Sequence, residues 1–113
     1  MKRILIVEDD LMLRNTVIEF LENNGFYCFG APNIEQAKEI LAHVQIDIVI
    51  TDWNMTEGSG LDLLQYVRKA HGNLPVILIA SADEGKKWKD LGFNGYLPKP
   101  AKLEKIIETI KKF

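Results

Sequence analysis

The segment DIVITDWNMTEGSG, residues 47–60, decides the fold class of this chain. Residues 48–51 form an apolar, largely β-branched run that is too short for a helix and is typical of a buried strand. A carboxylate, Asp52, follows where this strand is expected to end, and Gly58 and Gly60 come before the next apolar segment. An ionised side chain next to a buried strand is costly unless it is paired. The position of Asp52 therefore indicates a chemical role.

Length and composition limit the classes of protein to consider. The chain has 113 residues, which suits a single domain over 1–113. Its net charge of −2 does not favour direct binding to nucleic acid or to an anionic membrane. A single cysteine, Cys28, excludes an internal disulfide and favours a reducing compartment. No apolar run reaches the ~18 residues of a membrane span. We therefore expect a cytoplasmic protein.

Apolar runs alternate with amphipathic segments along the whole chain. Strands are predicted at residues 3–7, 26–30, 47–51 and 76–80 and within 94–100. Helices are predicted within 11–25, 33–44, 61–72, 83–92 and 103–113, the fourth being short and polar. Five strand–helix units with apolar strands predict an α/β fold, in which a five-stranded parallel sheet is covered by helices on both faces.

Polar side chains follow several of these strands. In doubly wound sheets, ligands bind outside the carboxyl ends of the strands. The residues at these ends are Glu8, Asp9, Asp10, Asp52, Ala80, Ser81 and Lys99. Crowded carboxylates suit a bound Mg²⁺, which prefers hard oxygen ligands, and a lysine suits a phosphoryl group. Asp52 beside Mg²⁺ is suited to be a nucleophile that forms an aspartyl phosphate.

Each of these residues also has a simpler interpretation. The acids at 8–10 can favour the N-terminus of the helix that follows, and Asp10 is expected to do only that. Asp52 alone suits a turn, and Lys99 alone suits the surface. Their joint placement at three strand ends favours a common site.

Five segments together carry a family resemblance. They are ILIVEDD, VITDWNM, GLDLL, LPVILIA and GYLPKP, in family order and near family spacing. Over its whole length the chain resembles the receiver domains of response regulators in two-component signalling. The resemblance implies a flavodoxin-like, three-layer fold with strand order 2-1-3-4-5.

The resemblance also implies roles for individual residues. Asp52 matches the phosphoacceptor of the family, and Lys99 matches the lysine that contacts the phosphoryl group. Glu8 and Asp9 match the acidic pair that binds Mg²⁺ together with Asp52. The backbone carbonyl of Asn54 matches a further ligand of this metal.

The residues that match the family's switch are less complete. Tyr96 matches the aromatic switch residue, and Pro100 is a candidate for a cis peptide bond after Lys99. The family's threonine or serine at the end of the fourth strand is Ala80 here. Ser81 is adjacent, but neighbouring strand residues point to opposite faces, so it does not simply substitute.

Two loop features and one helix also depart from the family pattern. Thr56 stands where the family usually has proline, and Gly58-Ser59-Gly60 suggests a looser loop before the third helix. The fourth helix is expected to be about a turn short and broken by Gly85. Phosphorylation chemistry is expected to survive these changes, whereas the conformational response to it is in question.

The leading functional prediction is a phosphoacceptor module that is not a conventional enzyme. It would take a phosphoryl group from a histidine kinase or a histidine phosphotransfer protein in a Mg²⁺-dependent reaction. Phosphorylation would then change the binding of a downstream protein or an attached output domain. The alternative is a receiver-like interaction module that does not switch, which Ala80 favours. A flavin-binding protein is disfavoured because the three acids at 8–10 would repel its phosphate. A phosphatase is disfavoured because Asn54 stands where such an enzyme would carry a second acid.

Overall fold

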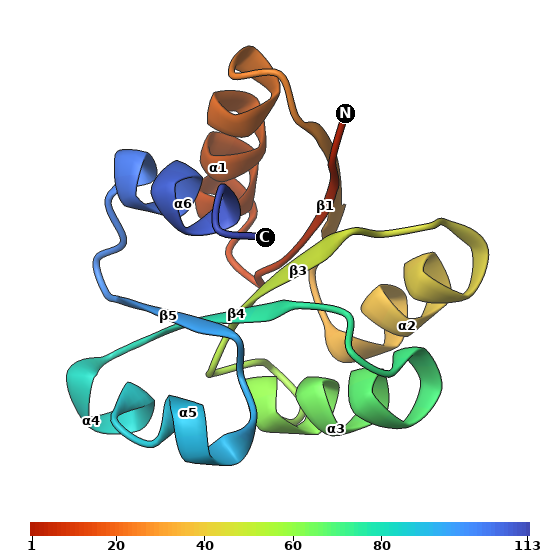
Figure 1. Ribbon diagram of the computed structural model, residues 1–113, viewed down its shortest axis with the longest axis vertical. Helices are drawn as coiled ribbons and strands as arrows, with labels where there is room; N and C mark the ends of the chain where they lie inside the picture. The colour runs from red at the N-terminus through yellow and green to blue at the C-terminus, as the bar shows by residue number, and fades with distance from the viewer.

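The computed structural model describes residues 1–113 and contains one five-stranded parallel sheet in the order β2-β1-β3-β4-β5 (Figure 1). The strands are β1 (Arg3–Val7), β2 (Tyr27–Ala31), β3 (Ile48–Asp52), β4 (Val76–Ala80) and β5 (Gly95–Pro98). The helices are α1 (Leu11–Asn23), α2 (Ile34–His43), α3 (Gly60–His71), α4 (Ala82–Gly85), α5 (Trp88–Leu91) and α6 (Leu103–Ile110). The predicted fold class and strand order are confirmed.

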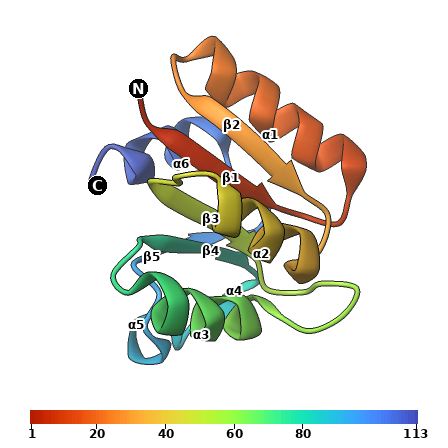
Figure 2. The same ribbon diagram turned by 90° about the vertical axis from the view of Figure 1, so that its right-hand side faces the viewer.

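Helices cover both faces of the sheet, which makes three layers (Figure 2). On one face, α1 and α6 pack Val17, Leu21 and Ile106 against alternate strand residues such as Ile6 and Ile50. On the other face, α2 and α3 pack against a second cluster that includes Leu5, Val49 and Leu78. Because successive strand residues point to opposite faces, strands buried on both sides need almost continuous apolar sequence. The apolar runs found in the sequence meet this requirement.

The boundaries of some elements differ from the predictions. The second strand is shifted by one residue and ends at Ala31, because it pairs in register with β1 from Arg3 to Val7. Asp52 is the last residue of β3 rather than the first residue after it, since it still pairs with Ile79 of β4. The last helix ends at Ile110, before residue 113.

The segment predicted as a short fourth helix is two separate helices of four residues each, α4 and α5. Gly85 ends the first, in agreement with the expected break. The second ends at Leu91 and is followed by the cap residue Gly92, which has a φ of 107°. No helix in the chain combines the length and the apolar character needed to cross a membrane.

The strand order brings the carboxyl ends of β1 and β3 together. Val7 pairs with Thr51, so the residues that follow β1 lie beside the end of β3. The residue after β5 lies beside the end of β4, where the Lys99 amide donates a hydrogen bond of 2.9 Å to the Ala80 carbonyl. The sheet thus collects polar residues from three loops at one edge.

Candidate functional site

Three carboxylates meet at the carboxyl ends of β1 and β3. Glu8, Asp9 and Asp52 each offer an oxygen atom, and these atoms lie within 4.8 Å of one another. Glu8 and Asp52 are buried, with 8% and 6% of their surface exposed, whereas Asp9 is exposed. Buried, closely spaced carboxylates are stable only with a compensating cation. The donor set of hard oxygen atoms suits Mg²⁺.

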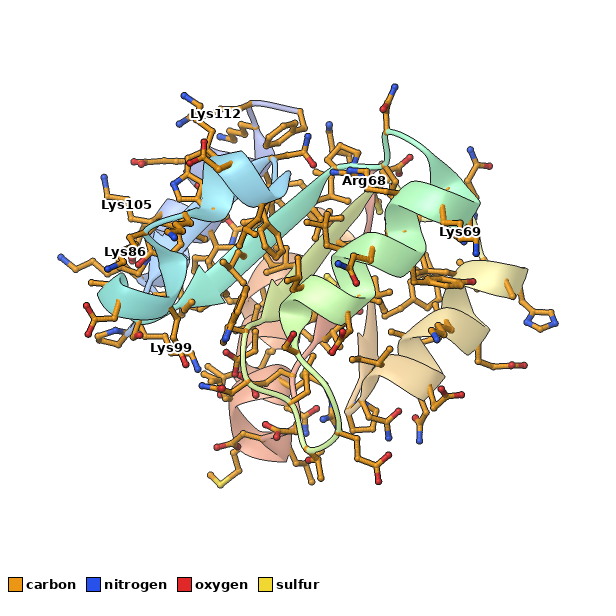
Figure 3. All side chains as sticks on the ribbon, turned by 90° about the horizontal axis from the view of Figure 1, so that it is seen from below. Arg68, Lys69, Lys86, Lys99, Lys105 and Lys112 are labelled. Atoms are coloured by element: carbon orange, nitrogen blue, oxygen red, sulfur yellow. The ribbon has the colours of Figure 1, made fainter.

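Lys99 supplies one positive charge to this cluster. Its Nζ lies 2.6 Å from Asp52 Oδ1, and the peptide bond between Lys99 and Pro100 is cis. Burial lowers the pKa of Lys99, but contact with Asp52 and the charges of Glu8 and Glu84 outweigh it and raise the pKa. Lys99 therefore stays protonated near neutral pH. Figure 3 shows it at the opposite end of the sheet from Arg68.

One lysine does not compensate all of the negative charge. Asp52 Oδ1 is buried, and its contact with Lys99 is a close ion pair. The pKa of Glu8 is raised from 4.5 to about 7, chiefly by burial and also by Asp52 and Asp9, although a hydrogen bond from the Asp10 amide acts in the opposite direction. Crowded carboxylates raise one another's pKa, and a cation among them would offset this repulsion. The residues present thus fit a bound divalent metal.

Hydrogen bonds connect the loop after β3 to the carboxylate cluster and to the start of α3. Thr56 Oγ1 donates a hydrogen bond of 3.2 Å to Asp9 Oδ2, and the Gly60 amide donates one of 2.8 Å to the Trp53 carbonyl. A Cβ atom at Gly60 would lie 2.6 Å from the backbone oxygen of Asp52, so only glycine lets α3 begin this close to the strand. The Ser59 amide also donates to Asp62 Oδ2 at 2.8 Å. These hydrogen bonds hold the loop at Thr56, Ser59 and Gly60.

The residues at the ends of β4 and β5 form a second part of the site. Ala80 is fully buried in the core. The Tyr96 hydroxyl donates to the backbone oxygens of Ala80 and Ser81, at 3.2 and 3.1 Å. Its ring lies directly against Gly85, where a Cβ atom would come within 2.1 Å of a ring carbon. Tyr96 is thus half-buried between β4 and α4.

An apolar cavity of about 470 Å³ adjoins the carboxylates on the α1–α6 side of the sheet. Leu13 and Val17 of α1 and Leu103 and Ile106 of α6 line it, and Asp52 is at its polar end. The carboxylates therefore lie at the edge of an apolar space that limits their contact with water.

Comparison with known proteins identifies the family. The family model described as the response regulator receiver domain matches residues 4–111. The chain belongs to the response regulator receiver domain family. It is 31% identical over 112 residues to the response regulator protein PilR of Pseudomonas aeruginosa, covering 96% of this chain and 25% of PilR. It is 33% identical over 113 residues to the transcriptional regulatory protein CpxR of Escherichia coli, covering 98% of this chain and 48% of CpxR.

Solved structures of receiver domains have the same fold. A response regulator receiver protein from Pseudomonas putida is 30% identical, with a TM-score of 0.90 and coverage of 99% of this chain and 97% of that one. The response regulator TrrA of Thermotoga maritima, solved in complex with Mg²⁺-BeF, is 28% identical with a TM-score of 0.90, and 99% of this chain and 98% of that chain are covered. The receiver described here spans only a quarter to about half the length of PilR and CpxR.

The structure brings Glu8, Asp9, Asp52 and Lys99 together at one site, and it shows two further contacts that the sequence did not predict. Asn54 lies in the loop after β3, and its side chain donates a 2.8 Å hydrogen bond to Glu84 of α4. Sequence reasoning missed Glu84, although Ser81 and Glu84 have the spacing of a capping box, which would have indicated it. It also missed the contact of Thr56 with Asp9, for which the sequence carries no local signal.

Proposed function

We propose that this receiver accepts a phosphoryl group on Asp52 from a phosphohistidine donor in a Mg²⁺-dependent reaction. The observation that carries the proposal is the buried Asp52 carboxylate, which lies 2.6 Å from Lys99 and within 4.8 Å of the Glu8 and Asp9 oxygens. Positioning and electrostatic stabilisation are what phosphoryl transfer requires of a protein.

Each residue has a distinct role in this reaction. A carboxylate oxygen of Asp52 attacks phosphorus, and the bond from phosphorus to the donor imidazole breaks, leaving its electron pair on nitrogen. Lys99 pairs with the charge on the phosphoryl oxygens. Glu8, Asp9, Asp52 and the backbone carbonyl of Asn54 would hold the Mg²⁺, which when bound offsets the negative charge of the carboxylates and the phosphoryl group. Hydrolysis by water later restores the Asp52 carboxylate and releases phosphate.

The donor and the downstream target follow from the family. The donor would be a histidine kinase or a histidine phosphotransfer protein, acting in the cytoplasm. The target would be a separate protein or an output domain, because the relatives are up to about four times as long as this chain. The receiver would not be a conventional enzyme, since it catalyses only its own phosphorylation and dephosphorylation.

One observation favours a second candidate, a receiver-like interaction module that does not switch. Tyr96 is already hydrogen-bonded to the backbone of Ala80 and of Ser81, and Ala80 has no hydroxyl group to offer a phosphoryl oxygen. In this case phosphorylation would leave the NMR shifts of Tyr96 nearly unchanged, and Ala80→Thr would make them respond.

A labelling experiment tests the proposed acceptor. Incubation with Mg²⁺ and a small phosphodonor should add one phosphoryl group that is labile at alkaline pH, as intact-mass measurement would show. Asp52→Asn should abolish the addition, because an amide is not a nucleophile. Asp10→Asn is the matched control, since Asp10 caps α1 and asparagine caps helices equally well. Labelling that persists in Asp52→Asn would place the acceptor elsewhere.

A further inference from the structure

Glu84 connects two segments that are thirty positions apart in the sequence. One oxygen of its carboxylate accepts a 2.8 Å hydrogen bond from the Asn54 side chain. The other accepts from the Ser81 amide and hydroxyl, at 3.3 and 3.2 Å. The Glu84 amide in turn donates to the Ser81 hydroxyl at 3.2 Å. The carboxylate thus caps α4 and at the same time binds the loop after β3.

The hydrogen bond between Asn54 and Glu84 lies between the proposed phosphoacceptor Asp52 and the aromatic residue Tyr96. Asn54 lies two residues after Asp52, and its neighbour Trp53 is held by hydrogen bonds to β4 and α3. At the other end, Glu84 precedes Gly85, which supports the Tyr96 ring. A shift of the loop after β3 would therefore reach Tyr96 through two contacts, the hydrogen bond from Asn54 to Glu84 and the packing of Gly85 on the Tyr96 ring.

The charges around Glu84 favour its ionised form. The hydrogen bond from Asn54 is the main cause that lowers the pKa of Glu84, and the positive charge of Lys99 contributes. Lys99 is paired with Asp52.

We propose that Glu84 is a positioning residue that couples the state of Asp52 to α4 and Tyr96 through Asn54. The proposal rests on the proposed phosphorylation of Asp52. β4 ends in Ala80, so no side-chain hydroxyl at that position links the phosphoryl group to the Tyr96 region. The hydrogen bond between Asn54 and Glu84 provides a link from the opposite side of the site. Phosphorylation of Asp52 shifts the loop after β3, and the hydrogen bond from Asn54 to Glu84 shifts the first turn of α4 in response.

NMR titration with Mg²⁺ and beryllofluoride, a phosphoryl mimic, tests this coupling. In the natural protein the backbone amides of Trp53, of Gly85 and of Tyr96 should all shift. In Glu84→Ala the Trp53 shift should persist, while the Gly85 and Tyr96 shifts are largely lost. Asn54→Ala should give the same pattern, and the double variant should show no further loss because both changes break one link.

Two further variants separate coupling from simple capping of α4. Ser81→Ala removes a capping hydroxyl but leaves the contact between Glu84 and Asn54, so it should keep the Gly85 and Tyr96 shifts. Asn54→Asp opposes two carboxylates and should lose these shifts. Adding Glu84→Gln should restore them, since the amide at position 84 then donates to the carboxylate at position 54.

The outcomes distinguish the coupling role of Glu84 from the proposed phosphorylation of Asp52, on which that role depends. An absent Trp53 shift in the natural protein would contradict binding of the mimic and thus the proposed function. A Trp53 shift with full Gly85 and Tyr96 shifts in Glu84→Ala would overturn only the coupling role. Equal losses in Ser81→Ala and Glu84→Ala, with none in Asn54→Ala, would also overturn it, by showing that Glu84 acts only as a cap.

Discussion

The site has an acceptor half, at the ends of β1 and β3, and a switch half, at the ends of β4 and β5. The two halves differ in how many of the expected family residues they contain. At the ends of β1 and β3, Glu8, Asp9 and Asp52 lie within 4.8 Å of one another, as the family resemblance implies. At the ends of β4 and β5, Ala80 has no hydroxyl, and Tyr96 is bonded to the backbone and packed on Gly85. The comparison indicates that the residues that bind metal and accept phosphate can be kept while the residues of the conformational response change.

The reason lies in the kind of interaction that each half uses. Metal binding and phosphoryl transfer need charged oxygens at fixed positions, and few residue types provide them. The response to phosphorylation needs only some contact that differs between two states, and several side chains can provide such a contact. A receiver can therefore change its switch residues and keep its acceptor site.

The largest effect is expected from removal of a metal ligand in the acceptor half. Asp9→Ala should weaken Mg²⁺ binding by more than about 100-fold, since loss of a partner that only orients a ligand already costs 10–100-fold. Calorimetry measures the affinity, and Trp53 fluorescence provides a second signal. Asp10→Asn should bind Mg²⁺ normally. Equal affinities in Asp9→Ala and the natural protein would show that the three acids are not the metal site.

A pair of glycine substitutions compares the packing of the two halves. Gly60→Ala should destabilise the protein by about 1–3 kcal/mol, because the new Cβ clashes with the backbone of Asp52. Gly85→Ala should cost less, since the clash there is with the Tyr96 ring, which can rotate away. Urea unfolding measures both changes. A larger loss in Gly85→Ala would mean that the Tyr96 position is the more rigid of the two.

The charge balance of the acceptor half predicts a pH dependence. The pKa of Glu8 is raised from 4.5 to about 7 by burial and by its acidic neighbours. Between these values the metal-free folded state binds more protons than the unfolded state, so its stability falls as pH rises. Relative to Glu8→Gln, the natural protein should lose stability across this window and no further above it. Parallel stability curves, measured with a chelator present, would contradict the raised pKa.

A smaller effect is expected from the hydrogen bond that orients Asp9. Thr56→Val removes the donor to Asp9 Oδ2 and keeps the shape of the side chain. Mg²⁺ affinity should fall by about tenfold, at the lower end of the range for such orienting partners. Thr16→Val is a matched control, because Thr16 bonds only to its own helix. An unchanged affinity would show that Asp9 is held by its backbone alone.

The smallest effect concerns the hydroxyl of Tyr96 in the switch half. Tyr96→Phe removes the hydrogen bonds to Ala80 and Ser81 and should cost about 0.5–1.5 kcal/mol of stability. Tyr27→Phe is the control, since Tyr27 is exposed. Mg²⁺ affinity should stay the same, and a marked change would show that the two halves are not independent.

Local pattern was enough to predict much of this receiver. The apolar runs predicted five strands, and the acids and lysine after them predicted where ligands would bind. The helix predicted within residues 33–44 begins at Ile34 as α2, where the Gln36 amide donates a hydrogen bond to the Asn33 side chain. These features depend on side-chain periodicity and backbone preference, which act over a few neighbouring residues.

Element boundaries were harder to predict, because sheet pairing decides them. Residue 52 belongs to β3 since its neighbour in β4 continues the ladder, and Ala31 belongs to β2 for the same reason. The division of one expected helix into α4 and α5 likewise depends on contacts outside the segment, such as the packing of Gly85 on Tyr96.

The sequence by itself determined the α/β class, the strand positions and the supply of carboxylates and lysine at strand ends. The tertiary structure decided which of these residues meet. Placement of β3 beside β1 brings Asp52 to Glu8, and the folding of α4 over the site brings Glu84 to Asn54. Such contacts join residues about 30 to 45 positions apart, and they depend on the lateral order of strands, which periodicity along the chain does not encode.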